Sequence, residues 1–589
     1  MNWKNTIISL TLTGSFIFTM SSCASKPVSS DVSDETTQVA ANVSQNLITE
    51  NKLSDEIHVD QLGYKLLAKK IAVIKGQYKK FQVVDSKTGV AVLTGDLTGN
   101  PKDESSGDTV CYADFSKITV PGKYFISISG LGKSYDFFID DNVYSKIGDA
   151  MQKALYYQRC GTALTTQFAG EYSHGECHKA LAKLYSDETK EIDVSGGWHD
   201  AGDYGRYVVP ASVTAAGLLL AYEIYPQVFT DATRIPESGN KIPDILDEAK
   251  YGIQWLLKMQ ESESGGVYHK VTSRGFPEMT TMPDKDVDDQ LVMPISTTAT
   301  ADFAAVTAMA SRIYMTIDPA FAQNCLESSK KAWEWLEKNK DFVDFNNPSD
   351  VASGEYGDSS GKDEKAWAAA ELFRATGDEK YNEYFIDNYQ VEGFGLGWQN
   401  VSGFAAIAYM FSDVSGTDQE KVDEIKKSWL DKADMFASTG QKDGYLVAMH
   451  KMEYNWGSNM NVATHATHLL IADRLKTDEK YTQAAEDCIH YLLGRNTLNQ
   501  SYITGYGSKQ VNKPHHRPSA ADLALKPVPG FMVGGPDSAL EDDVAKSKLS
   551  GKSPAECYID DVNSFSTNEV ATYWNSSAIF ILSYLNSNR

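Results

Sequence analysis

The sequence lacks the basic surface that nucleic-acid binding requires. Its 589 residues hold 55 Lys and Arg against 79 Asp and Glu, which gives a formal net charge of -24, and no basic stripe stands out. Because phosphate contacts need clustered Lys and Arg, this balance argues against a nucleic-acid surface. A Walker-type glycine loop is also missing. The acidity suits a neutral substrate, and it equally suits a surface that serves solubility alone.

Cysteine is scarce, with 7 residues scattered along the chain. Such spacing does not form the compact disulfide framework of a small secreted protein. The cysteines at positions 23, 160 and 177 stand in motifs that suit lipid attachment or metal binding. The pairing of the remaining four cannot be predicted from the sequence: Cys111, Cys325, Cys488 and Cys557.

Long apolar runs are missing apart from residues 7–18, which follow Lys4. This run is too short to span a bilayer but fits a secretory signal. The small residues before Cys23 resemble a bacterial lipoprotein cleavage site. We therefore expect residues 1–22 to be a lipoprotein signal peptide and Cys23 to carry a lipid that anchors the protein in a membrane. The expected location is the bacterial cell envelope, on an outer-membrane, surface or periplasmic face, with ordinary secretion as the alternative.

The chain is too long for one ordinary core, and its pattern changes along its length. Residues 23–54 are rich in Ser, Val, Thr, Asp and Asn without a period, which predicts a flexible linker. Residues 55–140 contain short strand-like runs separated by turn residues, at 71–74, 81–84, 90–93 and 124–129. These runs predict a small β-sandwich.

Residues 141–589 change to helical periodicity, and the strand signal fades after Asn142. Pro243 opens one helix whose apolar residues form a broad stripe. Further helices are predicted at 299–314, 328–338, 364–375, 401–411, 460–475, 480–493 and 569–585. Helices that alternate with long Gly-rich loops suit a ring of helix pairs whose loops gather at one end into a site. The expected fold is therefore mainly α, with a helical barrel behind the small sandwich.

Residues 195–208, SGGWHDAGDYGRYV, concentrate two carboxylates, a histidine and several glycines. The glycines disfavour a helix or strand, so the backbone is expected to form a loop that presents side chains. Asp200 and Asp203 stand three residues apart on this loop. Such a pair can bind a cation, or one carboxylate can activate a water molecule that the other orients. A plain solvated turn is the alternative.

Two further stretches near the C-terminus carry chemistry. In the first, His515 and Arg517 offer hydrogen bonds to a hydroxyl, a carboxylate or a phosphate. In the second, Glu569 stands at an expected helix start beside Phe565, Tyr573 and Trp574. A carboxyl group beside aromatic rings is partly desolvated, which raises its pKa and lets it hold a proton near neutral pH. Glu569 could instead simply stabilise the helix N-terminus.

Together these stretches resemble glycoside hydrolase family 9, the inverting cellulase family E. The first active-site signature of that family fits Ser501, Ile503, Thr504, Gly507, Lys509, Pro514, His515 and Arg517. The second fits Tyr558, Asp560, Phe565, Glu569, Ala571, Asn575 and Ser576. Residues 196–208 match the catalytic-base loop, and residues 235–260 and 354–358 are also family-like. Residues 59–64 and 115–126 resemble the immunoglobulin-like module of one subgroup. The resemblance implies an (α/α)6 barrel catalytic domain preceded by an immunoglobulin-like β-sandwich.

The resemblance also implies a function, an endo-β-1,4-glucanase that inverts the anomeric configuration. Glu569 would be the general acid, Asp203 the general base, and Asp200 would hold the attacking water. His515 and Arg517 would bind sugar hydroxyls. The candidate sugar-stacking residues are Tyr502, Trp398, Trp456 and Tyr573.

Two metals follow from the resemblance. The residues that resemble the zinc ligands of the subgroup are Cys160, Cys177, His178 and His199, a set of tetrahedral zinc type. This zinc would brace the catalytic loop and stay closed to substrate. The residues that resemble a calcium loop are Ser359, Ser360, Asp363 and Glu364, with Asn400 standing where the family has a further carboxylate.

Other interpretations stay open at this point. The same fold and catalysts could act on xyloglucan, on mixed-linkage glucan, or on cellodextrins cut from one end, because loops at the ends of the cleft decide the substrate. A non-catalytic glycan-binding lipoprotein is a further alternative, although it has no need of three such carboxylates. We expect a monomer. The charged segment 535–556 is expected at the rim of the cleft, without an assigned role.

Overall fold

The computed structural model describes residues 50–391, 393–522 and 526–587. The predicted signal peptide, Cys23 and most of the predicted linker lie outside these residues. The described residues belong to one compact unit. A search of their helices for a segment that is long and apolar enough to cross a membrane finds none.

The N-terminal part is a sandwich of two β-sheets, as predicted. One sheet has the order β1 (Ile57–His58), β3 (Ile71–Lys75) and β6 (Val110–Asp114). The other has the order β2 (Gly63–Tyr64), β9 (Phe137–Ile139), β7 (Gly122–Ile128), β4 (Lys80–Asp85) and β5 (Ala91–Asp96), with β8 (Gly132–Lys133) paired to β7. Apolar side chains such as Val83 and Ile126 fill the space between them.

The sandwich begins earlier than its predicted boundary at residue 55. Leu53 forms a bridge with Lys133, and the Ser54 amide donates to the Lys133 carbonyl at 2.9 Å. The prediction of a flexible linker is therefore wrong for residues 53 and 54. A linker composition does not prevent a short segment from pairing with a strand edge that offers free backbone groups.

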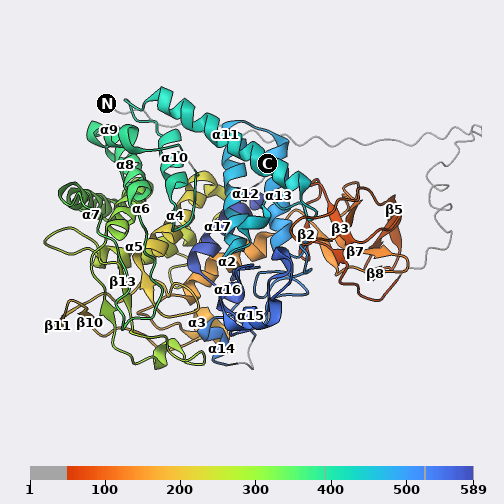
Figure 1. Cartoon of the computed structure of the whole chain (residues 1–589), viewed down its shortest axis with the longest axis horizontal. Helices are drawn as coiled ribbons and strands as arrows, with labels where there is room; N and C mark the ends of the chain where they lie inside the picture. Colours follow the sequence, from red (N-terminus) through yellow and green to blue (C-terminus); the bar gives the residue numbers. More distant parts are fainter. Residues whose placement is uncertain (1–49, 392, 523–525, 588–589) are drawn as a thin grey trace, which may run out of the picture. The chain divides into compact units, whose positions relative to one another are not determined.

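The larger part is a double ring of helices, which confirms the predicted (α/α)6 barrel. The buried inner helices are α4 (Val208–Ile224), α6 (Thr297–Tyr314), α8 (Lys362–Thr376), α10 (Ser402–Met410), α12 (Ser458–Leu475) and α17 (Thr572–Asn586). The outer helices are α2 (Ser145–Tyr157), α5 (Asp244–Lys258), α7 (Pro319–Lys338), α9 (Glu379–Asn388), α11 (Gln419–Lys442) and α13 (Glu479–Leu492). Along the inner ring α4, α6, α8 and α10 contact one another in turn, and α17 contacts both α12 and α4 (Figure 1).

The burial of the inner helices explains why hydrophobic periodicity alone did not predict helix α4. Helix α4 has the sequence VVPASVTAAGLLLAYEI and is buried on all sides. A helix that is apolar all round has no amphipathic stripe to detect. The prediction also missed α2, α9 and α11, whereas the predicted helix opened by Pro243 is α5, with Pro243 directly before its first residue.

Strands and short helices also occur within the barrel part. A small sheet has the order β11 (Asp187–Ile192), β10 (Ala182–Leu184), β14 (Leu291–Val292), β13 (Lys270–Thr272) and β12 (Arg206–Tyr207). The short helices are α3 (Thr166–Ala169), α14 (Arg517–Ala520), α15 (Asp543–Leu549) and α16 (Phe565–Asn568). The predicted helix start at Glu569 is wrong, because Glu569 is extended after α16 and the next helix begins at Thr572.

A buried polar cluster joins the sandwich to the barrel. The fully buried Asp60 carboxylate accepts a hydrogen bond from Tyr144 Oη at 3.0 Å and contacts His490 Nδ1 at 2.9 Å. Its other oxygen accepts the Leu62 and Gly63 amides at 2.8 and 3.0 Å. Since Tyr144 directly precedes α2 and His490 belongs to α13, this single carboxylate fixes the sandwich to two barrel elements.

Replacing Asp60 by alanine is expected to lower the free energy of unfolding by about 3–5 kcal/mol, because His490 and the Gly63 amide stay buried after losing their acceptor. Thermal and urea unfolding followed by circular dichroism would measure the change. The control is Asp96→Ala, which breaks an exposed ion pair with Lys80 and should have a far smaller effect. Equal stability of the two variants would contradict the interpretation.

Candidate active site

The three predicted carboxylates Asp200, Asp203 and Glu569 line one pocket of about 470 Å³. They come from the loop before α4 and the segment between α16 and α17, which are far apart in sequence. The other residues around the pocket are Ala201, Tyr207, Phe276, Gly354, Glu355, Tyr356, Trp398, Gln399, Asn455, Trp456, Ala539, Glu541, Tyr573 and Trp574. The fold therefore concentrates acidic and aromatic groups around a common space.

Close packing explains the glycines of the Asp200–Asp203 loop. A Cβ atom on Gly202 would lie 2.3 Å from the His515 carbonyl oxygen. A Cβ atom on Gly205 would lie 2.4 Å from the Tyr207 hydroxyl. Only glycine permits these approaches, so the loop can lie directly against the segment that contains His515.

Two donors hold the Asp203 carboxylate. Tyr207 Oη donates to Asp203 Oδ2 at 2.7 Å, and the Gly205 amide donates to the same oxygen at 3.0 Å. Asp203 is 7% exposed and faces the pocket. Two donors aimed at one oxygen fix the direction of the carboxylate.

Asp200 lies in a drier position, 3% exposed. Burial and the nearby charge of Asp203 raise the pKa of the Asp200 carboxyl well above its ordinary value. The Tyr356 hydroxyl donates to Asp200 Oδ2 at 2.5 Å and partly opposes that rise in pKa. Asp200 and Asp203 therefore form an interacting pair in which the two carboxylates have different partners.

Glu569 has the environment of a proton donor. Burial, reinforced by the charges of Asp203 and Asp200, raises the pKa of its carboxyl well above the ordinary value. The Gly202 amide donates to Glu569 Oε1 at 3.4 Å and brings the two catalytic segments together. The Gly534 amide fixes the Glu569 carbonyl at 2.9 Å. Glu569 can thus keep its proton at a pH where an ordinary carboxyl group is ionised.

Aromatic rings surround these carboxylates. Trp398, Trp456 and Tyr573 line the pocket, as expected of sugar-stacking residues. Trp456 is 44% exposed, which leaves part of its ring accessible to a ligand. Tyr502 does not lie there: it is fully buried and packs between Tyr491 and Tyr558. Its prediction as a sugar-stacking residue is wrong.

Arg517 supports the base loop, a role that the sequence did not predict. It is buried, and its guanidinium donates to the Pro277 carbonyl at 2.9 Å and to the Gly202 carbonyl at 2.7 Å. It is not among the residues that line the pocket, and its contact with sugar stays a prediction. His515 is half-buried with Nδ1 on the Val562 carbonyl at 2.7 Å, and its contact with sugar stays a prediction.

Cys160, Cys177, His178 and His199 meet in one cluster. Each offers a ligand atom, and these atoms all lie within 4.8 Å of one another, the one such group among the residues that the structure describes. The sulfur atoms are 3.9 Å apart, Cys160 Sγ lies 3.5 Å from His178 Nδ1, and Cys177 Sγ lies 3.7 Å from His199 Nε2. Tetrahedral zinc with bonds of about 2.0–2.3 Å has ligand-to-ligand distances of about 3.3–3.8 Å, so the cluster fits that ion.

The cluster is tied to the catalytic loop. His178 Nε2 lies 3.2 Å from Asp286 Oδ2, an outer carboxylate of the kind that orients metal-bound histidines. The His199 amide donates to the Gln158 carbonyl at 2.8 Å, and Gln158 Nε2 donates to the Ala201 carbonyl at 2.8 Å. The ligand His199 directly precedes Asp200, so the geometry of the cluster determines where the pair of carboxylates stands.

A second group of acids lies between α6 and α8. Asp302 and Glu364 are fully buried, and none of their four carboxylate oxygens has a hydrogen-bond partner among the described residues. Burial and the charges of Asp363 and Asp358 raise the pKa of Asp302. Unpartnered oxygens in a polar environment suit a hard cation. This group contains the predicted Asp363 and Glu364, and it adds Asp302, an acid within the alanine-rich helix α6 that the sequence analysis overlooked.

The predicted ligand Asn400 does not join that group through its side chain. Asn400 Oδ1 accepts the Gly395 amide at 3.0 Å and the Ser402 hydroxyl at 2.6 Å. This amide oxygen is used within its own turn, which argues against a role as ligand. Ser360 lies in the loop that leads into α8, where its amide donates to Asp358 at 3.1 Å. The structure does not test the predicted ligand roles of Ser359 and Ser360.

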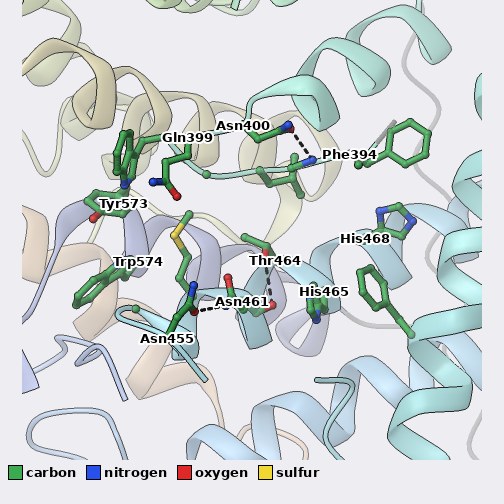
Figure 2. Close-up of a pocket in the computed structure, with 18 of the residues that line it drawn as sticks. Phe394, Gln399, Asn400, Asn455, Asn461, Thr464, His465, His468, Tyr573 and Trp574 are labelled. Atoms are coloured by element: carbon green, nitrogen blue, oxygen red, sulfur yellow. Dashed lines mark hydrogen bonds between the residues drawn. The ribbon is translucent and has the colours of Figure 1, made fainter. Parts of the chain in front are cut away.

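A groove of about 250 Å³ continues from the active-site pocket (Figure 2). The two spaces share the wall residues Trp398, Gln399, Asn455, Trp456, Tyr573 and Trp574. Beyond them the groove runs between the loop that precedes α10 and the helix α12, past Asn461 and Thr464 to Phe394 and His468 (Figure 2). The ligand-binding space therefore extends well past the three carboxylates.

Sequence reasoning missed several residues that contact the carboxylates or support their loop. Tyr207 and Tyr356 lie inside family-like runs, and their hydroxyl groups were the feature of the sequence that could have identified them as partners of the carboxylates. Nothing in the sequence around Lys270 marked it as part of the site. Its ammonium donates to Asn347 Oδ1 and the Gly354 carbonyl, each at 2.6 Å, and burial lowers its pKa to about 7. Since Lys270 lies on β13 beside β12, only the sheet brings it under the catalytic loop.

Comparison with known proteins agrees with this geometry. A cellodextrinase of Butyrivibrio fibrisolvens is 35% identical over 549 residues, covering 90% of this chain and 99% of the relative. A xyloglucan-specific endo-beta-1,4-glucanase of Bacteroides ovatus is 32% identical, covering 91% and 94%. The crystal structure of an endoglucanase from Alicyclobacillus acidocaldarius matches with a TM-score of 0.85 at 34% identity, covering 91% of this chain and all of that one.

Two family descriptions match as well. The cellulase N-terminal ig-like domain covers residues 52–133, and the glycosyl hydrolase family 9 description covers residues 144–582. The second match takes in the base loop, the zinc-type cluster and Glu569, so that family and active-site geometry point to the same residues. The chain is therefore a glycoside hydrolase that belongs to glycosyl hydrolase family 9, with the immunoglobulin-like domain of one subgroup at its N-terminal side.

Proposed function

We propose that this protein hydrolyses the β-1,4-glucosidic bonds of cellulose or a related β-glucan with inversion of the anomeric configuration. One observation carries the proposal: Glu569, with a raised pKa, lines the same pocket as the carboxylates Asp200 and Asp203. An inverting glycosidase needs one carboxyl group that holds a proton and an opposing carboxylate that activates water.

Glu569 supplies the proton. It donates to the glycosidic oxygen as the bond to the anomeric carbon breaks, so the leaving sugar departs as a neutral alcohol. The resulting Glu569 carboxylate stays close to the Gly202 amide, which can hydrogen-bond the negative charge. Proton loss from Glu569 thus occurs beside a fixed donor.

Asp203 removes a proton from the attacking water, and Asp200 holds that water in place. Tyr207 and Gly205 occupy Asp203 Oδ2, which leaves the other oxygen to face the pocket. Tyr356 restrains Asp200 in the same way. Water attacks the anomeric carbon from the side opposite the leaving group, and the configuration inverts.

The size of the binding space favours an oligomeric or polymeric substrate. The pocket and its adjoining groove measure about 470 and 250 Å³ and share an aromatic wall. Flat rings stack on the apolar faces of sugars, and several rings in sequence suit several linked sugars. We propose endo action on β-1,4-glucan. Xyloglucan, mixed-linkage glucan and cellodextrins cut from an end are the alternatives that a substrate panel distinguishes.

We propose that zinc occupies the cluster of Cys160, Cys177, His178 and His199. The spacing of the four ligand atoms and the outer carboxylate of Asp286 support it. Bound zinc would be structural, because four protein ligands leave no open position for substrate. Its effect on catalysis is to fix the loop that contains Asp200.

We also propose calcium between α6 and α8, with Asp302, Asp363 and Glu364 as the acidic ligands. The four unpartnered carboxylate oxygens of Asp302 and Glu364 support it. A hard cation with oxygen ligands would neutralise the repulsion between these buried acids. Its contribution is stability of the loop that leads into α8.

We propose that the enzyme is tethered to the bacterial cell envelope through a lipid on Cys23 and acts as a monomer. The tether rests on the sequence alone, since Cys23 lies outside the described residues. A monomer suffices because the three catalytic carboxylates all come from one chain.

Replacing Glu569 by glutamine is expected to lower kcat on β-1,4-glucan by about 10²–10⁴-fold, because the amide cannot deliver a proton. Reducing-sugar release from soluble cellulose derivatives, xyloglucan, mixed-linkage glucan and cellodextrins would measure it. NMR of the wild-type reaction should show the α-anomer first. An initial β-anomer would refute inversion, and inactivity on every glucan would refute the substrate class.

The pH dependence of kcat/KM should be bell-shaped. Glu569 must be protonated, so the rate falls as pH rises through its raised pKa; Asp200 must be ionised to hold the water, so the rate falls as pH falls through the pKa of Asp200. In Tyr356→Phe the hydrogen bond that lowers the pKa of Asp200 is lost. The acidic limb should therefore move to higher pH while the alkaline limb stays in place. An unmoved acidic limb would show that Asp200 does not titrate in the reaction.

Replacing Cys177 by serine is expected to release the zinc and lower the melting temperature, because one of four ligands is lost. Elemental analysis of the purified protein should give one zinc per chain for the wild type and much less for the variant. The matched control is Cys111→Ser, a buried thiol of the sandwich, which should retain the zinc. A wild-type protein without zinc after purification in zinc-containing buffer would argue against the proposal.

A further inference from the structure

The charged segment 535–556 reaches the catalytic pocket. Ala539 and Glu541 of this segment line the same space as Asp203 and Glu569. Neither residue has a part in the proton transfers of the glucanase reaction. Glu541 is exposed at the rim, and its carboxylate can accept hydrogen bonds from a ligand without first breaking an ion pair with a Lys or Arg of the described residues.

Two buried aspartates hold this rim segment in one shape. Asp537 is fully buried and accepts the Ala539 amide at 2.9 Å and the Glu541 amide at 3.3 Å. Asp542 accepts the Ala545 amide at 2.7 Å, which caps α15. The backbone on either side of Glu541 is therefore fixed before any ligand arrives, and its side chain does not need a loop rearrangement to face the pocket.

The same hydrogen bonds join the rim segment to the aromatic wall. Asp542 Oδ2 also accepts the hydroxyl groups of Ser564 and Ser566 at 2.8 and 2.9 Å. Phe565, between those serines, packs on Trp456 with ring centroids 5.2 Å apart.

A second connection runs through the residues before Trp456. The amide and hydroxyl of Ser538 both donate to the Tyr454 carbonyl at 2.8 Å. Three chain segments thus form one assembly that presents a partly exposed indole ring and a carboxylate at the edge of the pocket.

An indole ring beside a carboxylate favours one chemical class of ligand. The apolar face of a pyranose stacks on an indole ring, while its equatorial hydroxyl groups donate to acceptors around the ring edge. A carboxylate has only acceptor atoms and makes stronger hydrogen bonds than a neutral group. The ligand that uses both features is a neutral sugar unit with free hydroxyl groups.

We propose that Glu541 and Trp456 form a sugar subsite at the rim of the catalytic pocket, in which the Glu541 carboxylate accepts hydrogen bonds from the hydroxyl groups of a glucan unit that stacks on Trp456. The inference rests on the proposed glucanase function. Glu541 is a specificity-determining residue in this view, because only glucans long enough to reach the rim gain its hydrogen bonds.

The test compares wild-type enzyme with Glu541→Ala and Glu541→Gln on purified cellodextrins from cellotriose to cellohexaose. For Glu541→Ala we expect kcat/KM on cellohexaose to fall about tenfold, mainly through a higher KM, because a hydrogen bond to a charged acceptor is lost. On the shortest cellodextrin that is cleaved the loss should be under about twofold. Glu541→Gln keeps an acceptor oxygen and should recover part of the loss.

The matched control is Asp543→Ala, an exposed acid two residues away that does not line the pocket. A binding measurement adds a readout independent of turnover: titration of cellohexaose into Glu569→Gln, with and without Glu541→Ala, should show a similar loss of affinity. If Glu541→Ala matches Asp543→Ala while the wild type cleaves cellodextrins, the subsite is refuted and the glucanase function stands. If the wild type cleaves no glucan, both fail.

Discussion

The mutual repulsion of three carboxyl groups in one small pocket is the constraint on which this enzyme depends. Asp200, Asp203 and Glu569 are close enough for the first two to raise the pKa of Glu569, and burial adds to that rise. Three negative charges in such a space would be costly, so at least one group keeps its proton. The Tyr356 hydroxyl opposes the rise in the pKa of Asp200. The proposed reaction places the retained proton on Glu569, next to the departing sugar.

The surrounding structure serves to hold these charges where repulsion would otherwise separate them. Arg517 and Gln158 bind the carbonyls of Gly202 and Ala201, and the glycine at 202 lets the loop lie against the His515 segment. The cluster of cysteines and histidines fixes the residue before Asp200. Most of this support consists of hydrogen bonds to main-chain atoms, which position the loop and leave the carboxylate oxygens free for other partners.

Much of the fold and of the site could be predicted from particular residues. The carboxylates, Trp398, Trp456 and the four cluster residues stand in local motifs that residue type and family resemblance identify. Tyr502 and Arg517 stand in such motifs too, yet both are buried, because a motif records a residue and not the direction of its side chain. Helix α4 escaped detection since a helix buried on all sides has no polar face, and Asp302 was hidden in the apolar sequence of α6.

By itself, the sequence determined the family and the two-part architecture and predicted the acid and the bases, because these depend on short runs of residues and on local hydrophobic patterns. Only the tertiary structure decided which groups touch. Tyr207 and Gly205 reach Asp203 through a tight local turn, whereas Tyr356 and Glu541 reach the pocket from distant segments of the chain. Such contacts depend on how the barrel closes and on how the sheet β12–β13 pairs. A pKa depends on those distant neighbours and on burial, so the protonation of Glu569 is a property of the folded chain.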